Sequence, residues 1–361
     1  MILYIHIPFC HRICPYCSFY KHTPGDTDKR KFIGSLLQEA RIAVASGHLS
    51  KISTLYLGGG TPSMLSPKHL TGLFEGLHAE LTLDDTHITM EANPATFEGS
   101  KAALFKSLGV NRVSLGIQSF TPHVLKSLGR EHSSEDAVKS VKILQTTGME
   151  EVNIDLMFSV PGQSITDWQN TIKTALSLNP DHISAYNLTY EEDTPFFEKL
   201  RHHEDENINA DMFTLAHNKL TDAGYHHYET SNYARHGMES RHNLAYWHGE
   251  DYLGLGPSAV STCNGKRWKN IPDTAGYIHA IQAVGHAKSE EEIIDSEAYR
   301  IERIALLLRT TDGLPEKYLR ESRKEIVKSL LTENLAEIKN GKFRLIGDGT
   351  MLVDAVAEKI V

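Results

Sequence analysis

Hydrophobic and polar positions follow two alternating patterns along the first half of the chain. Short apolar runs rich in β-branched residues predict strands, and longer stretches with apolar residues every three or four positions predict helices between them. This alternation indicates βαβ units around a parallel sheet. The predicted strands are 3–7, 54–57, 87–91, 112–116, 151–157 and 182–188, and the predicted helices are 30–46, 67–77, 97–107, 133–147 and 165–176.

These units predict an α/β fold, but they are too few for a closed barrel. Six strand-helix units are visible, whereas a complete (β/α) barrel has eight. We therefore predict a partial (β/α)6, TIM-like barrel over residues 1–195. A doubly wound open sheet is the alternative that the pattern leaves open.

The pattern changes after about residue 195. A polar segment and a helix over 207–223 lead into a loop region rich in histidine, glycine and aromatic residues. Two further helices and two short apolar runs follow, and the runs are joined at Asn340-Gly341, which is a hairpin signal. We predict a connecting region over 196–290 and a smaller α+β, winged-helix-like domain over 291–361.

Composition and charge narrow the class of protein. Of 361 residues, 40% are hydrophobic and 23% are charged, as in an ordinary soluble globular protein. The net charge of −9 and the scattered Lys and Arg residues argue against a nucleic-acid partner. The first residues resemble neither a signal nor a transit peptide, and no run reaches the ~20 apolar residues of a membrane span. We expect a cytoplasmic protein.

The four cysteines are distributed unevenly. Cys10, Cys14 and Cys17 follow the first predicted strand at once, and Cys263 stands alone. This distribution does not suit a disulfide framework but suits a metal site, because closely spaced thiolates in one loop select zinc or an iron–sulfur cluster. Three ligands would leave one iron of a cubane open to a small molecule. The spacing alone also allows zinc, with a fourth ligand from His6, His11 or His22.

Ordered motifs around these cysteines resemble the radical-SAM proteins related to oxygen-independent coproporphyrinogen III oxidase. The resemblance covers most of residues 1–260 and implies a [4Fe-4S] cluster on Cys10, Cys14 and Cys17 that binds S-adenosylmethionine (SAM). The motifs are Tyr4-Ile-His-Ile-Pro-Phe-Cys10, Cys14-Pro-Tyr-Cys17, Gly58-Gly-Gly-Thr-Pro62, Glu91-Ala-Asn-Pro94, Gly116-Ile-Gln-Ser-Phe120, Leu128-Gly-Arg130 and Asn153-Ile-Asp-Leu156.

The resemblance also implies a set of SAM-binding residues, most of them at the ends of successive predicted strands. The carboxyl ends of barrel strands are where (β/α) sites are built. Glycine backbone can approach a ligand closely, and a carboxylate within an apolar strand needs a partner. Without the resemblance, the glycine run reads as a turn and the arginine as a solvated cation. The implied residues are Tyr4, Gly58, Gly59, Gly60, Thr61, Glu91, Gln118, Arg130 and Asp155.

Two features separate the chain from the oxidase itself. Phe19 stands where the oxidase has a fourth cysteine, and the segment from His242 to Trp247 resembles a signature of the heme-chaperone branch of this family. An imidazole can ligate heme iron, and aromatic side chains can stack on a porphyrin. The alternative interpretation is a local cap with core aromatics. The candidate heme-binding residues are His242, Asn243, Tyr246 and Trp247.

Three functions stay open on the sequence. The first is a heme chaperone that carries a [4Fe-4S] cluster and SAM and passes heme to apo-hemoproteins of the respiratory chain. The second is a coproporphyrinogen III oxidase, which would decarboxylate two propionates to vinyls by radical chemistry. The third is a zinc-stapled barrel. Whether the protein is an enzyme is therefore open, and the resemblance suggests a homodimer.

Overall fold

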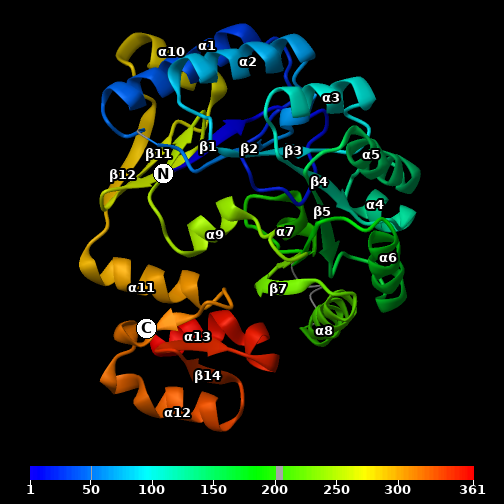
Figure 1. Cartoon of the computed structure of the whole chain (residues 1–361), viewed down its shortest axis with the longest axis vertical. Coiled ribbons are helices and arrows are strands. Elements are labelled where there is room, and N and C mark those ends of the chain that lie inside the picture. Colours follow the sequence, from blue (N-terminus) through cyan, green and yellow to red (C-terminus); the bar gives the residue numbers. More distant parts are fainter. Residues whose placement is uncertain (50, 201–205) are drawn as a thin grey trace.

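Six parallel strands follow one another across the sheet in the order in which they occur along the chain (Figure 1). This computed structural model describes residues 1–49, 51–200 and 206–361. A strand order without a reversal excludes the doubly wound alternative and confirms the α/β, (β/α)6 arrangement. The strands are β1 (Ile2–Ile7), β2 (Thr54–Gly59), β3 (His87–Ala92), β4 (Arg112–Gln118), β5 (Glu151–Phe158) and β6 (His182–Asn187).

Helices fill each crossover and cover the outer face of the sheet (Figure 1). The Ser66, Ser133 and Ser164 hydroxyls cap three of them at their amino ends. The third helix begins two residues later than predicted, and α4 was not predicted. The helices are α1 (Lys29–Ala45), α2 (Pro67–Glu80), α3 (Gly99–Ser107), α4 (Pro122–Ser127), α5 (Ser134–Thr147) and α6 (Ile165–Ser177).

Side chains of the parallel strands alternate between a packed face and a site-facing one. Along β1, Leu3, Ile5 and Ile7 belong to the main hydrophobic core, which lies between the sheet and its helices. Tyr4 and His6 point to the opposite face. That inner face therefore carries the polar and aromatic groups available for a site.

Strands from the predicted connecting region extend the sheet at both edges. Two follow β6, and four lie beyond β1, where β9 pairs with β1 in parallel. Whether boundaries at 195 and 290 separate independent units stays a prediction, and residues 201–205 of this region lie outside the described part. The added elements are β7 (His226–Glu229), β8 (Asn232–Ala234), β9 (Tyr252–Leu255), β10 (Val260–Cys263), β11 (Lys266–Asn270), β12 (Lys288–Ile293), α7 (Pro195–Leu200), α8 (Glu206–Asp222), α9 (Arg241–Trp247) and α10 (Thr274–Val284).

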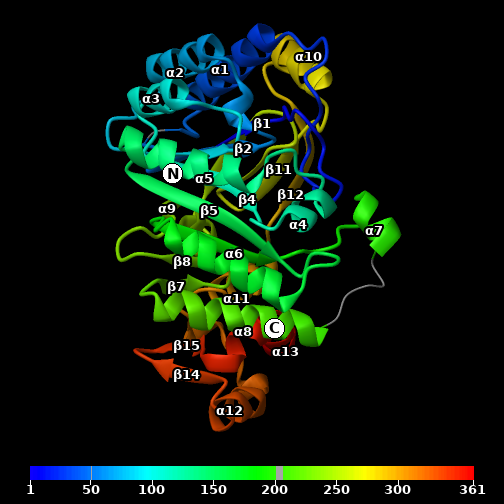
Figure 2. The same ribbon diagram turned by 90° about the vertical axis from the view of Figure 1, so that its right-hand side faces the viewer.

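The C-terminal part, residues 296–361, has its own hydrophobic core and three-stranded sheet. Figure 2 shows it beside β7 and α8. The predicted hairpin is confirmed: Asn340 and Gly341 have φ of 52° and 72°, as a two-residue hairpin turn requires. The winged-helix classification stays a prediction. Its elements are α11 (Ser296–Leu307), β13 (Leu314–Pro315), α12 (Lys324–Thr332), β14 (Ala336–Lys339), β15 (Lys342–Leu345) and α13 (Val353–Ile360).

No helix among the described residues is both long enough and apolar enough to span a lipid bilayer.

A buried ion-pair cluster joins the amino ends of three neighbouring strands. Glu151, at the start of β5, accepts hydrogen bonds from His87 Nε2 at 2.9 Å and from Arg112 Nη1 at 3.2 Å. Burial alone would raise the pKa of Glu151, but the hydrogen bonds and charges of these two partners outweigh it and lower that pKa. These ion pairs lie at the amino-terminal end of the barrel strands, the end that contributes to stability in (β/α) folds.

Glu151→Gln removes the charge and leaves Arg112 buried without a carboxylate. We expect the free energy of unfolding, measured in urea at pH 7, to fall by about 3 kcal/mol. The neighbouring exposed Glu150→Gln is the control and should change it by less than about 0.5 kcal/mol. Because the pKa of Glu151 is lowered on folding, its contribution is present above pH 4.5, so the difference between the variants should shrink as the pH falls below that value. Equal losses in both variants would contradict this role.

Candidate functional site

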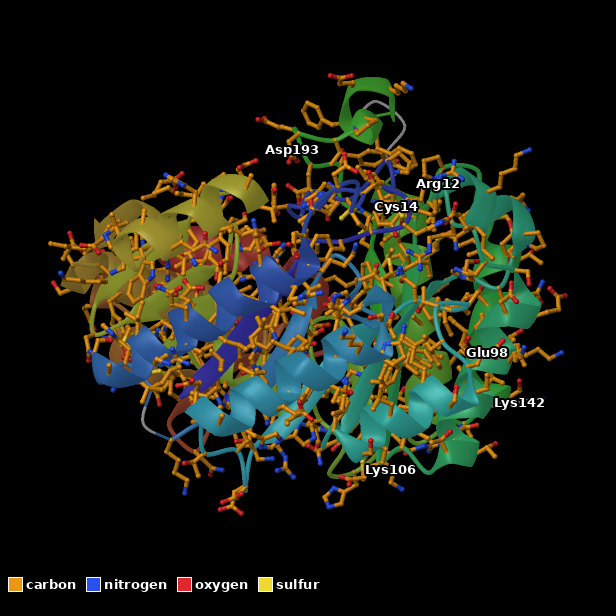
Figure 3. All side chains as sticks on the ribbon, turned by 90° about the horizontal axis from the view of Figure 1, so that it is seen from above. Arg12, Cys14, Glu98, Lys106, Lys142 and Asp193 are labelled. Atoms are coloured by element: carbon orange, nitrogen blue, oxygen red, sulfur yellow. The ribbon has the colours of Figure 1, made fainter. Side chains whose placement is uncertain are left out.

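The three clustered cysteines lie on a loop that leaves the carboxyl end of β1, and Figure 3 labels Cys14 on this loop. Backbone hydrogen bonds close the base of the loop, from Cys10 N to His22 O at 3.0 Å and from His22 N to Pro8 O at 2.8 Å. A bond of 3.2 Å from Cys17 N to Cys14 O forms a turn within it. All three thiols are free and half-buried, so one short, anchored segment presents three soft ligands.

Glycines at the end of β2 allow the cysteine loop to lie against that strand. A Cβ on Gly60 would stand 2.8 Å from the carbonyl oxygens of Ile7 and Phe9, and one on Gly59 would stand 2.4 Å from the His6 ring. Gly59 also has φ of 105°, which side-chain-bearing residues rarely adopt. Without a side chain, Gly60 comes close enough for its backbone N to donate a hydrogen bond to Ile7 O at 2.8 Å. The glycine run is therefore a close approach and not only a turn.

We call the space between this loop and the strand ends the cysteine cavity. Its volume is about 160 Å³. It brings together the three cysteines and most of the predicted SAM-binding residues. Its lining comprises Cys10, Arg12, Cys14, Tyr16, Cys17, Phe19, Lys21, Gly59, Gly60, Thr61, Glu91, Ala92, Asn93, Ser114, Gly116, Gln118, Arg130, Asp155 and Tyr186.

Glu91, at the end of β3, is the carboxylate nearest the glycine run. Its Oε2 accepts a hydrogen bond from Gly59 N at 3.1 Å, and its Oε1 accepts one from Tyr56 OH at 2.9 Å. Burial raises the pKa of Glu91 to about 7, helped by the negative charge of Asp155 and opposed by these two hydrogen bonds. A bound cation would favour the ionised form of Glu91.

Asp155 lies on β5, where neutral hydroxyl and amide groups of the described residues hydrogen-bond its carboxylate. Ser114 Oγ lies 3.2 Å from each of its oxygens, and Asn153 Nδ2 donates to Oδ1 at 2.7 Å. Burial raises the pKa of Asp155, and these donors limit the rise. The partners expected for a carboxylate in an apolar strand are therefore hydroxyl and amide groups.

Arg130 lines the cysteine cavity and is held by hydrogen bonds, so it is not a solvated cation. Its Nη2 donates to Asn93 Oδ1 at 2.7 Å and to Gly116 O at 2.6 Å, and its Nη1 lies 3.7 Å from Cys14 Sγ. Gln118, at the end of β4, is held in a left-handed conformation with φ of 69° and accepts a hydrogen bond from Tyr186 OH at 2.6 Å. Both predicted residues are thus fixed by partners at the strand ends.

The histidines considered as zinc ligands are directed elsewhere. Both ring nitrogens of His6 are hydrogen-bonded, to Tyr4 OH and Tyr20 O, and those of His22 are bonded to Thr23 O and Thr274 Oγ1. His11 pairs with Glu131 on the surface. Within the described ranges, no three His, Cys, Asp or Glu side chains converge as a set of metal ligands. A single zinc ion needs ligands that converge, whereas each thiol of a [4Fe-4S] cluster binds a different iron, so three separate thiols without a histidine suit a cluster better than closed zinc.

A second hollow adjoins the first, and we call it the aromatic cavity. Its volume is about 450 Å³, and it shares Phe19, Gly59 and Glu91 with the cysteine cavity. Three of the four candidate heme residues line it. Tyr4, predicted to contact SAM, lies here and not in the cysteine cavity. The lining comprises Tyr4, His6, Ser18, Phe19, Tyr20, Tyr56, Gly59, Glu91, His242, Asn243, Tyr246, Tyr252, Ser258, Ala259, Val260 and Lys269.

His242 is a buried, neutral imidazole between two tyrosines. Its Nδ1 bonds Thr54 Oγ1 at 2.8 Å, and its ring stacks on Tyr56 at 4.9 Å and meets Tyr246 edge-on at the same distance. Burial lowers the pKa of His242 to about 3. Nε2 has no hydrogen-bond partner in the described part of the chain, so in the tautomer whose Nδ1 donates to Thr54 the lone pair of Nε2 is available for a ligand.

Two predicted residues lie outside both cavities. Gly58 packs within β2, where a Cβ would stand 2.8 Å from the Tyr56 ring and 3.0 Å from the Glu91 carboxyl carbon. Trp247 turns toward the C-terminal part, and Arg309 lies 5.9 Å from its ring centroid. Seven residues of helix are enough to place Trp247 and His242 on different sides, which the motif itself did not reveal.

The far end of the same helix is attached to the C-terminal part. Arg303 Nη1, from α11, donates to the carbonyl oxygen of His248 at 2.6 Å, and His248 Nε2 lies 2.9 Å from Asp312 Oδ2. A Cβ on Gly249 would stand only 1.4 Å from Arg303 Nη1, so the guanidinium occupies space that glycine leaves free. Helix α9 therefore contacts the aromatic cavity through His242, Asn243 and Tyr246, and the C-terminal part at its carboxyl end.

Several site residues were missed by sequence reasoning. Tyr56 and Ser114 lie on the inner face of β2 and β4, which the period of two along each strand could have indicated. Asn93 belongs to the motif Glu91-Ala-Asn-Pro94, and its side-chain amide donates a hydrogen bond to Thr61 Oγ1 at 3.0 Å. Tyr186, near the end of β6, lies on the inner face by the same period of two.

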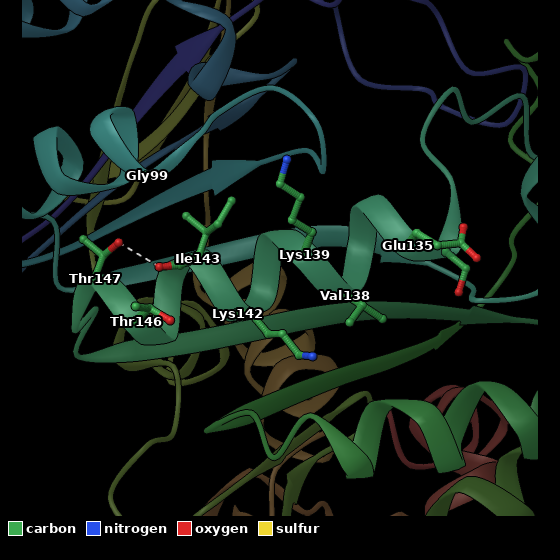
Figure 4. Close-up of a pocket in the computed structure, with 9 residues that line it drawn as sticks. Gly99, Glu135, Val138, Lys139, Lys142, Ile143, Thr146 and Thr147 are labelled. Atoms are coloured by element: carbon green, nitrogen blue, oxygen red, sulfur yellow. Dashed lines mark hydrogen bonds between the residues drawn. The ribbon is translucent and has the colours of Figure 1, made fainter.

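A further hollow of about 560 Å³ opens on the outer surface between α3 and α5 (Figure 4). It is lined by Gly99 and by residues of α5 such as Lys139 and Lys142. None of the predicted site residues lines it, so it is separate from the two cavities.

The comparisons with known proteins agree with this geometry. Residues 4–175 match the Radical SAM superfamily. The structure of coproporphyrinogen III oxidase (HemN) from Escherichia coli, described as a radical SAM enzyme, superposes with a TM-score of 0.84. It covers 99% of this chain and 89% of its own, at 22% sequence identity. At this identity the similarity establishes the fold.

Relatives found by sequence have a higher identity to this chain than the HemN structure has. The heme chaperone HemW of Bacillus subtilis is 35% identical over 324 residues, which are 88% of this chain and 86% of that protein. The heme chaperone HemW of Escherichia coli is 40% identical over 259 residues, which are 71% and 68% of the two chains. Together with the Radical SAM match, this identity over most of both proteins shows that the chain belongs to the HemW family of radical SAM proteins.

Proposed function

We propose that this protein is a heme chaperone, which binds heme in the aromatic cavity and passes it to apo-hemoproteins. The observation that carries the proposal is that the two cavities share a wall. His242, Asn243 and Tyr246 line one cavity, and three free thiols line the other. The aromatic cavity suits a flat, apolar ligand, since tyrosine rings surround a neutral histidine. The names of the HemW relatives point to the same cargo.

The cysteine cavity fits a [4Fe-4S] cluster with SAM. Its donor set is three thiols on one loop, with Gly59 and Gly60 leaving room that any side chain would fill. Bound there, the cluster would supply electrons and one iron free to bind a small molecule. Cys10, Cys14 and Cys17 would hold the cluster.

The remaining lining residues of the cysteine cavity suit the parts of SAM. Glu91 can accept hydrogen bonds from the amino group of its methionyl moiety, and Arg130 can pair with a carboxylate. Asp155 and Gln118 offer further oxygens at neighbouring strand ends. Gly60 and Thr61 line the cavity beside the loop. These groups would bind and orient SAM.

In the aromatic cavity, His242 would hold the heme iron through Nε2, the nitrogen without a partner. Its bond to Thr54 through Nδ1 fixes the ring, and its lowered pKa keeps the imidazole neutral and able to ligate iron. Tyr246 and Tyr56 would contact the porphyrin. Trp247 would act at the junction with the C-terminal part instead.

The chaperone is favoured over the oxidase by Phe19. This side chain is 66% exposed and lines both cavities, at the position where the oxidase has a further cysteine. The similarity to the HemN structure bears on the fold alone. An exposed aromatic ring at the junction of the cavities suits contact with a porphyrin face.

Partners and location extend the same proposal. Apo-hemoproteins of the respiratory chain would receive the heme, and the protein would act in the cytoplasm, as a homodimer. The barrel over 1–195 and the region over 196–290 would together form the site, and residues 291–361 would support it through α9.

Cys14→Ser should abolish the cluster. Anaerobically reconstituted wild-type protein should contain about four irons per chain, and this variant less than about one, measured with sulfide and zinc in parallel. Cys263→Ser is the matched control and should keep the full iron content, because Cys263 is buried in β10, away from the loop. Stoichiometric zinc without sulfide would contradict the cluster.

Binding of SAM should depend on pH through Glu91. With the pKa of Glu91 at about 7, its carboxylate is mostly protonated at pH 6 and mostly ionised at pH 8. We expect the affinity of the reconstituted protein for SAM, measured by calorimetry, to increase over this range. Glu91→Gln should remove the increase, whereas the exposed Glu75→Gln should retain it. A pH dependence unchanged in Glu91→Gln would refute this role.

His242→Ala should weaken hemin binding at least about tenfold and shift the Soret band, because the iron loses its ligand. His248→Ala, on the side of α9 that faces Asp312, is the control and should keep both affinity and spectrum. The same preparations should not convert coproporphyrinogen III when supplied with SAM and a reductant. Robust conversion by wild-type protein would favour the oxidase.

A further inference from the structure

The charges around the aromatic cavity are unevenly placed. Of the described residues that line it, Lys269 is the one lysine or arginine, and burial lowers the pKa of the two lining histidines, His6 to about 4 and His242 to about 3. Glu91 supplies a carboxylate. The rest of the lining is mainly aromatic or small.

Lys269 differs from its neighbours on β11 in having no ionic partner. Lys266 lies 3.7 Å from Glu291, and Arg267 pairs with Glu292 at 3.6 Å and with Glu302. Among the described acidic groups, none lies within 4 Å of the Lys269 ammonium. A half-buried cation with no ion pair within 4 Å, beside two paired ones on the same strand, is available to bind an anion.

The alternation of side chains along β11 places Lys269 on the cavity side. Its partners across the two ladders are Val260, which also lines the cavity, and Glu290 on β12, which makes no ion pair with Lys269 within 4 Å. The preceding residue, Trp268, is buried on the other face, where Lys288 Nζ lies 4.0 Å from its ring centroid. The register of the sheet therefore places the Lys269 side chain in the wall of the aromatic cavity.

We infer that Lys269 binds a propionate carboxylate of the heme and so sets the orientation of heme in the aromatic cavity. This inference rests on the proposed function and names the group by which the cargo is recognised. Heme is a flat aromatic ring with two carboxylates on one edge, and the cavity combines tyrosine rings with a single cation. A lysine gives a point charge that suits such a carboxylate.

Glu91 makes the opposite orientation unfavourable. The strands that carry the two charges are five places apart in the sheet order β11-β10-β9-β1-β2-β3, so the charges enter the cavity from well-separated strands. A propionate next to Glu91 would meet a like charge, whereas a propionate at Lys269 meets an opposite one. Heme would thus enter with its apolar edge toward the cysteine cavity.

The test compares hemin with hemin dimethyl ester, whose carboxylates are uncharged. Binding is measured by Soret titration of the full-length, anaerobically reconstituted protein. Lys269→Met should weaken binding of hemin about tenfold and leave binding of the ester within about twofold. Lys269→Arg should restore most of the hemin affinity, and Lys266→Gln, on the opposite face of the same strand, should behave as wild type.

The outcomes separate this inference from the proposed function. If wild-type protein binds hemin and Lys269→Met binds it equally well, or loses affinity for the ester to the same extent, the role of Lys269 is refuted and the chaperone proposal stands. If Lys269→Met instead loses SAM with hemin unchanged, Lys269 serves SAM and the inference is again refuted. If wild-type protein binds no hemin, both proposals fail.

Discussion

The close approach between the ends of β1 and β2 is the constraint on which the site depends. The backbone of Gly60 lies against the carbonyls of Ile7 and Phe9, and Gly59 lies against the ring of His6. Any side chain at either position would push the cysteine loop away from the strand ends. Because both cavities use Gly59 as a wall, one steric condition determines the shape of both.

Glu91 connects the two cavities electrostatically. Its carboxylate holds the backbone of Gly59 and the hydroxyl of Tyr56, and it lines both spaces. A change in the charge of Glu91 on SAM binding would therefore be felt in the aromatic cavity. The proposed SAM site and the proposed heme site share a titratable wall, which would give a physical route by which one ligand could influence the other.

Much of the barrel and half of the site follow from the sequence. The six strands alternate with helices of ordinary period, and the residues at their carboxyl ends converge because parallel strands end at one edge. The period of two places Tyr56 and Tyr186 on the inner faces of their strands, but it does not tell a site tyrosine from a packed one. Nor did it show that Trp247 faces away from His242, because the direction of each side chain in a seven-residue helix depends on what packs against it.

The contact between Arg303 and the end of α9 has a consequence for biosynthesis. The carbonyl of His248 is synthesised 55 residues before the guanidinium that binds it. As the chain emerges from the ribosome, the barrel strands and the cysteine loop can form first, while the end of α9 still lacks its partner. The wall that carries His242 would be completed only when α11 has folded against it, so a nascent chain would form the cysteine loop before it finishes the aromatic cavity.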